Sequence, residues 1–557
     1  MDTQRLVLFV IFSFSILMLW DAWQREQRPP TPAQQQVQGQ GGQPTGVPTP
    51  SAPAPTATPS APAAVTPDAV PSSASAGPGR ELVKVETDLF RAGIDPVGGD
   101  LVQLELKPYR DSLDPSKTFQ LLGADHRYAV QTGLVGQNLP NHKTAFTTEA
   151  KSYSLAEGKD AVEVKLHAAT PEGAKVTKTL TFRRGSYLVD VAHEIANGTT
   201  APITAHAYFQ IARDGKSPAD DKPMVSTFTG AAVYTEQEKF AKVPFGDIDK
   251  GKVPYPKSAN DGWVAMIQHY FVTAILPPEK APREYYTRKI AENLYTVGTI
   301  LPVPSIAPGA TGTVGVRVYA GPEEQENLKA VAPGLDLVVD YGWLTVIAAP
   351  LFWVLEWFHG WLGNWGLAII ALTVLIKLIF FPLSAASYKS MARMKKVTPR
   401  LTKMREMYGN DRAKMNQAMM ELYKEEKINP LGGCLPIVVQ IPVFIALYWV
   451  LLASVELRQA PFYGWIRDLS APDPFYVLPA IMMASMLVQT KLSPTPPDPV
   501  QAKVMMIMPF AFGVMFFFFP AGLVLYWVVN NVLSIAQQWQ ITRMIEGGKD
   551  KPATAKR

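Results

Sequence analysis

Asn364–Leu383 reads NWGLAIIALTVLIKLIFFPL, and Lys377 is the one charged residue in this apolar stretch. A charge inside a membrane-inserted helix costs roughly 2.5–3.5 kcal/mol on insertion scales, so such a residue usually has a function. Thr373 lies four residues before Lys377 and therefore on the same helical face. The stretch predicts a membrane-spanning helix with a polar stripe toward Pro382.

Two interpretations of Lys377 are open. Its stem can extend toward the membrane interface, which lies about 9 Å away at 1.5 Å per residue. Alternatively, it faces a water-filled cavity, because other apolar stretches also carry polar residues. These polar residues are Gln440, Ser485, Gln489, Tyr526, Asn530, Ser534 and Gln537.

The composition indicates several domains with different surroundings. The chain has 557 residues, too many for one core, and charged residues make up 18 % of it but are sparse in its last third. The net charge of +5 is modest and does not indicate a nucleic-acid-binding protein. A single cysteine, Cys434, excludes an intrachain disulfide.

The N-terminal region predicts an anchor followed by a tether. Leu6–Trp20 is uninterruptedly apolar, and no small-x-small cleavage pattern follows it. We therefore expect an uncleaved transmembrane anchor in residues 1–23, with a cleaved signal peptide as the alternative. Residues 24–80 are rich in Pro, Gln, Ala and Ser, a composition typical of a disordered tether.

Residues 81–330 show the alternation of β-strands. Val102, Leu104 and Leu106 alternate with polar residues, and turn signals separate several such runs. Many short alternating strands predict an antiparallel β-sandwich. Pro322–Val331 reads as a short helix that leads toward the membrane.

The last third predicts a helical membrane core. Thr345–Leu362 is aromatic and amphipathic, which favours a helix in the membrane interface within a linker of residues 331–362. Residues 363–541 contain five candidate spans, which make six with the anchor. The candidates are Asn364–Leu383, Leu435–Val455, Phe475–Thr490, Val504–Phe519 and Gly522–Ile541.

The distribution of charge predicts the orientation. The loop of residues 384–429 has eleven Lys and Arg against five Asp and Glu, and the tail of residues 542–557 is also basic. Positive loops stay in the cytoplasm, so the N-terminus is expected inside and the sandwich outside.

The same loop predicts a cytoplasmic helical hairpin with a methionine-rich seam. The seam either packs the two helices together or offers an adaptable surface to apolar clients. Its residues include Met391, Met394, Met404, Met415 and Met419.

No motif in the sequence specifies an enzyme, a metal site or a cofactor. The candidate spans contain no Asp, and neither a phosphate-binding G-x-x-x-x-G-K-[ST] loop nor H-E-x-x-H occurs. A coupled transporter would normally carry acidic residues inside the membrane. A channel or transporter for polar solutes and an envelope enzyme acting on glycans nevertheless stay open as alternatives.

Four motifs resemble the YidC family of bacterial membrane protein insertases, and the order of the parts matches as well. The motifs are Asn429-Pro-Leu-Gly-Gly-Cys, Gln440-Ile-Pro-Val-Phe, Glu456-Leu-Arg-Gln-Ala-Pro-Phe and Gly522-Leu-Val-Leu-Tyr-Trp. The resemblance covers the chain except its tether.

This resemblance implies a five-span core around a hydrophilic groove that is closed toward the periplasm. Lys377 occupies the position of the family's positive groove residue, which is usually arginine, and so loses the two-pronged guanidinium contact. Thr373 matches a further groove position, and Trp527 or Tyr526 an aromatic one. With Gln440, Gln489, Asn530 and Ser534 they form the expected groove.

The resemblance further implies an apolar slide for client helices and a chaperone role without nucleotide hydrolysis. Implied partners are nascent inner-membrane proteins, the Sec translocase with its accessory subunits and the ribosome, in a Gram-negative inner membrane. The β domain resembles the family's periplasmic super-sandwich, itself similar to sugar-binding folds. The expected slide comprises Val443, Phe444, Leu447, Met508, Phe512 and Phe516.

Overall fold

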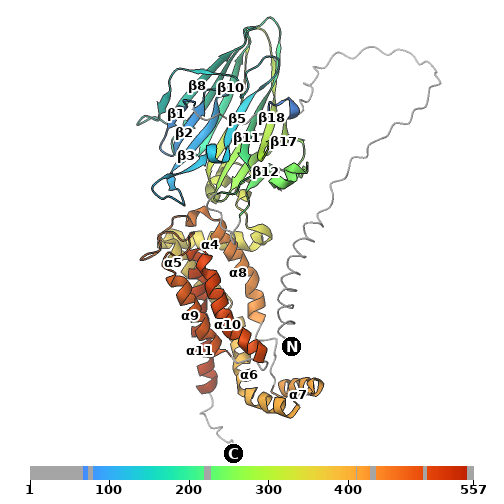
Figure 1. Cartoon of the computed structure of the whole chain (residues 1–557), viewed down its shortest axis with the longest axis vertical. Helices are drawn as coiled ribbons and strands as arrows, with labels where there is room; N and C mark the ends of the chain where they lie inside the picture. The colour runs from blue at the N-terminus through green and yellow to red at the C-terminus, as the bar shows by residue number, and fades with distance from the viewer. Residues whose placement is uncertain are drawn as a thin grey trace, which may run out of the picture.

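The structure is a computed structural model that describes residues 67–72, 80–218, 227–408, 411–426, 435–493 and 499–547. The predicted anchor, most of the predicted tether, Cys434 and the end of the basic tail lie outside the described residues. A β-sandwich forms one end of the elongated molecule, and a helical bundle forms the other (Figure 1).

The predicted β-sandwich is confirmed. It consists of a ten-stranded and a nine-stranded sheet, and its strand pairs are antiparallel except for the parallel pair β1–β7. The larger sheet contains β1 (Val83–Glu86), β2 (Phe90–Asp95), β3 (Asp100–Arg110), β4 (Thr118–Leu122), β5 (Ala129–Val135), β7 (Ser152–Ser154), β11 (Ile203–Asp214), β14 (Ser258–Ala259), β17 (Arg283–Ala291) and β18 (Leu294–Ile306). The smaller sheet contains β6 (Thr147–Thr148), β8 (Ala161–Ala169), β9 (Lys175–Arg183), β10 (Leu188–Ala196), β12 (Gly230–Thr235), β13 (Lys239–Val243), β15 (Trp263–Gln268), β16 (Phe271–Leu276) and β19 (Thr311–Pro322).

Alternating side chains of the two sheets form the sandwich core. Leu104 and Leu106 of β3 are fully buried, while Glu105 between them is only half-buried. The central strand β11 differs, because both of its faces are buried along most of its length. Strands with one solvent-facing side give the period-two pattern that the sequence shows.

The N-terminal segment before β1 covers part of the second face of β11. Pro67–Ala69 form the 3-10 helix η1, and Val70 is buried against Tyr208, Tyr286 and Ile300. Arg288 donates hydrogen bonds to the carbonyls of Pro67 and Val70. The structure thus differs from the predicted tether at residues 67–72, where one buried valine and two backbone acceptors hold the chain on the sheet.

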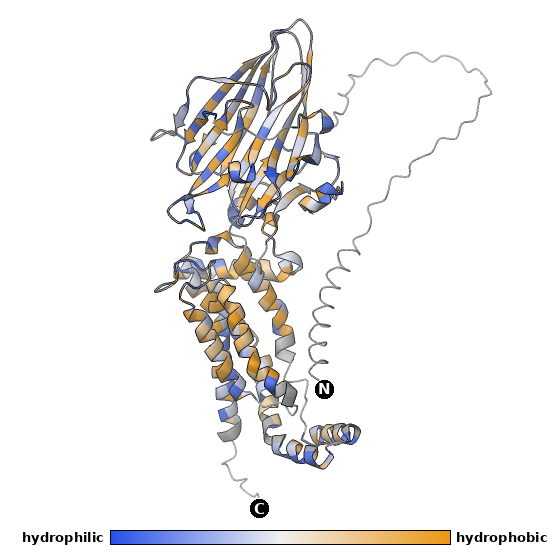
Figure 2. Ribbon diagram, viewed as in Figure 1, coloured by the Kyte–Doolittle hydropathy of each residue, from blue (hydrophilic) through white to orange (hydrophobic). Residues whose placement is uncertain are grey.

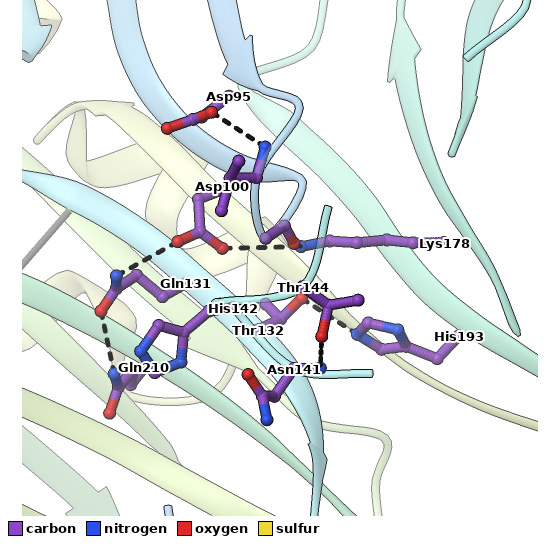
Figure 3. Close-up of polar contacts among 12 residues, drawn as sticks. Asp95, Asp100, Gln131, Thr132, Asn141, His142, Thr144, Lys178, His193 and Gln210 are labelled. Carbon is purple, nitrogen blue, oxygen red and sulfur yellow. Dashed lines mark hydrogen bonds and ion pairs between the residues drawn. The ribbon is translucent and has the colours of Figure 1, made fainter. Parts of the chain in front are cut away.

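A buried polar cluster joins the two sheets inside the sandwich (Figure 3). Lys178 of β9 donates to the carbonyl of Gly98, and its Nζ lies 3.8 Å from Oδ1 of Asp100 on β3. Burial raises the pKa of Asp100 and lowers the pKa of Lys178. His193 of β10 lies 3.0 Å from Oγ1 of Thr132.

The C-terminal part is helical, with apolar residues dominating the bundle and hydrophilic residues frequent near its far end (Figure 2). Short helices α2 (Phe245–Asp249) and α3 (Gln325–Val331) belong to the sandwich and its exit. The others are α4 (Thr345–Leu362), α5 (Trp365–Ile379), α6 (Phe381–Tyr408), α7 (Arg412–Glu425), α8 (Leu435–Ala453), α9 (Val477–Leu492), α10 (Pro499–Met515) and α11 (Ala521–Gly547). Five 3-10 helices lie among the described residues after η1: η2 (Ala124–His126), η3 (Leu335–Val338), η4 (Gly342–Leu344), η6 (Val455–Leu457) and η7 (Phe516–Phe518).

The prediction of one helix over Asn364–Leu383 is wrong. α5 ends at Ile379, α6 begins at Phe381, and the two axes meet at 66°. Pro382 has no N–H to donate and is tolerated only in the first turn of a helix, so the chain restarts there. No single described helix is long and apolar enough to cross a membrane. The bent pair of α5 and the first part of α6 together is long and apolar enough.

The helices α4 and α6–α7 have the expected patterns. α4 buries Ala348, Phe352 and Leu355 and exposes Trp353, Trp357 and Trp361 on the other side. In the hairpin of α6 and α7, Met394, Met404 and Met419 pack against a small core of Val397, Leu401, Leu422 and Tyr423. Met415 is half-buried on α7. The seam therefore holds the two helices together.

Candidate functional site

A cavity of about 260 Å³ lies between five helices of the bundle, around Lys377. α5 contributes Lys377, and α6, α8, α9 and α11 contribute the other walls. Most of the lining side chains are polar although the helices are largely apolar. The lining residues are Lys377, Ser384, Ser387, Tyr388, Met391, Gln440, Ile441, Phe444, Gln489, Tyr526, Trp527, Asn530 and Ser534.

The ammonium of Lys377 is held inside the bundle by α11. Its Nζ donates to Oγ of Ser534 at 2.8 Å, and the hydroxyl of Ser534 donates to the carbonyl of Asn530 at 2.7 Å. The Lys377 side chain is only 6 % exposed. Since a lysine that extended to the interface would present its nitrogen at the surface, this geometry favours the cavity interpretation.

One positive charge faces neutral polar groups in this cavity. Among the described residues that line the cavity there is no Asp or Glu, so the hydroxyl of Ser534 rather than a carboxylate accepts the hydrogen bond of the ammonium. An ammonium donates three hydrogen bonds, and Ser534 accounts for one of them. The site is therefore suited to attract an anionic group that enters the cavity.

Amide side chains connect the walls of the cavity. Nε2 of Gln440 on α8 donates to Oδ1 of Asn530 on α11 at 3.2 Å. On the neighbouring face of α11, Asn531 donates to Oγ of Ser485 on α9 at 3.2 Å. Two successive asparagines thus tie α11 to α8 and to α9, which holds Lys377 and Ser534 in register.

Aromatic side chains close one end of the cavity. The ring of Phe444 meets the ring of Trp527 edge-on, with centroids 4.7 Å apart, and Trp527 also contacts Phe516 at 4.9 Å. Tyr526 is 2 % exposed, and its ring stacks on that of Phe444 with centroids 6.0 Å apart. Both aromatic candidates therefore line the cavity, and the ring of Phe444 contacts both of them.

Seven of the eight predicted groove residues come together here, and Thr373 does not. Thr373 is fully buried one turn before Lys377, and its hydroxyl donates to the carbonyl of Ile369 at 2.7 Å. A hydroxyl that bonds within its own helix is satisfied without a cavity. The functional role of all eight residues stays a prediction.

The predicted slide residues are divided between buried and accessible positions. Leu447 and Phe516 are at most 2 % exposed and pack inside the bundle. Val443, Phe444 and Phe512 are half-buried, and Met508 is exposed. The larger exposed apolar surface of α10 consists of Met506, Ile507, Phe510 and Val514, next in sequence to the predicted residues.

Sequence reasoning missed the contribution of α6. Ser384, Ser387, Tyr388 and Met391 all line the cavity, but only Met391 was among the predicted residues, as part of the cytoplasmic hairpin. Their spacing of three, one and three residues places them on one helical face, which is a signal the sequence carries. The bend before Pro382 turns that face toward Lys377.

The geometry is that of an apolar helical bundle with a charged internal cavity, and comparisons with known proteins show the family of the chain. Two family models match the chain, the YidC periplasmic domain over residues 82–354 and the 60Kd inner membrane protein over residues 357–549. The membrane protein insertase YidC of Aromatoleum aromaticum is 57% identical over 562 residues, which cover 99% of this chain and 100% of the relative. That of Nitrosospira multiformis is 56% identical, with 98% of each chain covered.

The chain therefore belongs to the YidC family of membrane protein insertases, whose members are inner-membrane proteins with a periplasmic domain. A crystal structure of an active YidC insertase with its first transmembrane domain resolved aligns with a TM-score of 0.39 and 19% identity, over 82% of this chain and 92% of that one. A galactose mutarotase-like protein from Lactobacillus casei aligns over 43% of this chain with a TM-score of 0.28.

Proposed function

We propose that the cavity around Lys377 is the site at which this insertase receives the polar segment of a client membrane protein. The position of Lys377 carries the proposal, because its ammonium lies among polar groups inside an apolar bundle. Acidic residues in the client's translocated tail are attracted to this charge. Lysine offers them a point charge without the planar fork of arginine.

The physical problem that the cavity solves is desolvation. A polar tail loses water when it crosses lipid, and each unsatisfied backbone group there costs several kcal/mol. A water-filled cavity that reaches into the membrane from the cytoplasm shortens the dry path. The burial of the client's apolar helix in lipid then supplies the free energy, so nucleotide hydrolysis and cofactors are not required.

The exposed apolar surface next to the cavity supports a lateral exit for the client helix. Ile441 is 47 % exposed on α8 and lines the cavity, while α10 exposes Met506, Ile507 and Phe510. An emerging apolar helix meets no desolvation penalty on such a surface. We assign the slide to these residues together with the half-buried Val443, Phe444 and Phe512 and the exposed Met508.

The orientation and partners complete the proposal. The anchor and five spans cross the inner membrane with the basic α6–α7 hairpin and tail in the cytoplasm and the β-sandwich in the periplasm. α4, with its exposed tryptophans, lies in the interface. Nascent inner-membrane proteins are the clients, and the Sec translocase and the ribosome are the expected partners.

Charge reversal tests the proposal directly. Lys377→Glu is expected to reduce the insertion of clients with acidic tails at least tenfold and of clients with neutral tails much less, because only the former lose electrostatic attraction. Insertion is measured by protease protection of translated clients in proteoliposomes without added nucleotide. Lys491→Glu is the matched control, since Lys491 is exposed at the end of α9 and does not line the cavity. Equal losses for both kinds of tail would contradict electrostatic capture.

A further inference from the structure

The β-sandwich is joined to the helical part by the segment Glu456-Leu-Arg-Gln-Ala-Pro-Phe, for which the cavity gives no role. Arg458 donates from Nη2 to the carbonyl of Arg110 at 2.7 Å and to Oγ of Ser112 at 3.0 Å. The amide of Gln459 forms hydrogen bonds with both backbone groups of Arg110, at 2.8 and 3.2 Å. This segment, residues 456–462, therefore binds the end of β3 and the loop that follows it. We call this contact region between the sandwich and the helical part the joint.

Aromatic rings reinforce the contact of Arg458. Its guanidinium lies 5.1 Å from the ring centroid of Phe119 and 5.3 Å from that of Phe271, and these two rings stack on each other. A guanidinium over an aromatic face is attracted by the ring quadrupole. Because arginine stays charged at all ordinary pH values, this half of the joint does not respond to pH.

Two carboxyl groups from opposite sides form the other half of the joint. Glu323 follows β19 of the sandwich and is 4 % exposed, and its Oε1 has no hydrogen-bond partner among the described residues. It lines a cavity of about 120 Å³ together with His269, Asp340 and Trp449 of α8. Glu456 belongs to the helical part, and its enclosed Oε2 likewise has no partner in the described part of the chain.

The charged groups around Glu323 favour its neutral form on balance. Burial is the largest cause that raises its pKa well above the ordinary value, and the negative charges of Asp340 and Glu456 add to the effect. Lys242 of β13 opposes them but is paired with Asp340. His269, on the turn between β15 and β16, lies 3.0 Å from the carbonyl of Leu452.

The groups around Glu456 act in the same direction. The pKa of Glu456 is raised to about 7, mainly by burial, and the carboxylates of Glu324 and of Glu356 on α4 contribute in the same direction. The backbone N–H groups of Gln325 and of Glu456 itself lower it in part. The side chain of Gln325 also donates a hydrogen bond to the hydroxyl of Tyr341.

We propose that the joint is a proton-operated latch, in which Glu323 and Glu456 hold the sandwich on the helical part only while they are neutral. When both carboxyls are ionised, two negative charges lie close enough to repel each other at one interface, and each has a buried oxygen without a hydrogen-bond partner among the described residues. Ionised carboxylates are costly to bury unless they are paired, so separation of the surfaces relieves the cost. The neighbouring cavity has room for about four water molecules at roughly 30 Å³ each, through which hydration can begin.

The direction of the pH dependence follows from linkage. The docked state binds the Glu456 proton more tightly than the separated state, in which the carboxyl has its ordinary pKa of 4.5. Docking is therefore strongest below pH 4.5 and weakens as the pH rises through about 7. Glu456 alone changes the docking equilibrium roughly 300-fold over this range, at about tenfold per pH unit. This inference is independent of the proposed role of Lys377.

Distance measurements on the full-length protein in lipid nanodiscs test the latch. Cys434→Ser removes the native thiol, and spin labels are placed at Lys165→Cys on β8 and Arg467→Cys after α8, two exposed positions on opposite sides of the joint. We expect one narrow distance distribution at pH 5.5 and a broadened or second population at pH 8.5, with a midpoint near 7. An identical distribution at both pH values would overturn the proposal.

Three variants separate the latch from other titrations. Glu323→Gln combined with Glu456→Gln mimics the neutral pair, and the distribution is expected to stay narrow at both pH values. Glu456→Gln alone removes the carboxyl whose pKa is about 7, so the wild-type midpoint near 7 is expected to disappear. Glu326→Gln on α3 is the matched control, because this carboxylate is exposed and should leave the wild-type titration unchanged. If the distance distribution of the double variant or of Glu456→Gln still changes with the wild-type midpoint, the proposal is overturned.

Discussion

Nζ of Lys377 lies 2.8 Å from Oγ of Ser534, and the hydrogen bond between them joins α5 to α11 across 157 positions of the sequence. The hydroxyl of Ser534 donates in turn to the carbonyl of Asn530, so its lone pairs are left to face the ammonium. The serine thus positions Lys377, the only charged residue among the described residues that line the cavity. Arginine, with its planar group, would need a different partner here.

Removal of the Ser534 hydroxyl should release the ammonium. A hydrogen bond to a charged group contributes about 1.5–3 kcal/mol, so Ser534→Ala is expected to lower the insertion of acidic-tail clients roughly tenfold or more. Ser534→Thr keeps the hydroxyl and should retain most activity. Insertion rates in proteoliposomes measure the effect, with Thr490→Ala as a control, because the hydroxyl of Thr490 donates to the carbonyl of Met486 in its own helix. Equal losses for acidic and neutral tails would indicate a structural role instead.

The bond between Gln440 and Asn530 should contribute measurably to stability. Double-mutant cycles on such interhelical bonds in membranes average about 0.6 kcal/mol. We expect a coupling of that size for Gln440→Leu and Asn530→Leu, from thermal unfolding of the full-length protein in detergent. Strict additivity of the two replacements would show that water competes successfully for both amides.

Gly366 near the start of α5 has no room for a side chain. A Cβ there would clash with the ring of Phe462, the last residue of the segment that contains Arg458. Gly366→Ala is therefore expected to destabilise the bundle by about 1–3 kcal/mol, through forced repacking. Gly360→Ala on α4 is the control, because a Cβ at that position meets open space and should leave the melting temperature equal or higher.

The buried His193 is expected to make the β-sandwich less stable in acid. Burial lowers the pKa of His193 from 6.5 to about 3, so the folded state refuses a proton that the unfolded state accepts. The contribution of neutral His193 to the free energy of unfolding is complete above pH 6.5 and is lost as the pH falls toward 3. Between pH 6.5 and 4 the loss is on the order of 3 kcal/mol, at about 1.4 kcal/mol per pH unit.

Hydrogen exchange of the Leu188–Ala196 amides in the full-length protein measures this loss. The unfolding free energy of His193→Gln should fall less steeply with acid than that of the wild type. Asp100, whose pKa is raised by burial, acts in the opposite direction and is present in both proteins. His167→Gln, on half-buried β8, is the matched histidine replacement. The same slope in the wild type and in His193→Gln would refute the assignment.

The sequence predicted the parts of this protein well because each part has a local pattern. Alternation marked the strands, and α4 spans the same residues as the predicted interfacial helix, Thr345–Leu362. Lys377 could be predicted as a functional residue because it is the one charge in an apolar stretch. The bend at Phe380 was missed, since Pro382 is equally compatible with a helix end and a new first turn.

Periodicity says which face a residue lies on but not what covers that face. Leu447 and Phe516 are apolar, as residues of a lipid-facing slide would be, yet they are buried inside the bundle. Ser384 and Ser387 belong to a polar stretch that predicts a cytoplasmic hairpin, yet they line the cavity.

The sequence by itself determined a β-sandwich, a set of apolar helices and one buried charge, because hydrophobic period and composition act over a few residues. Only the tertiary structure decided that Ser534 meets Lys377 and that the carboxyl groups of Glu323 and Glu456 lie near enough at the joint to influence each other. Such pairs are brought together by the packing of whole elements, in which many weak contacts far apart in the chain select one arrangement.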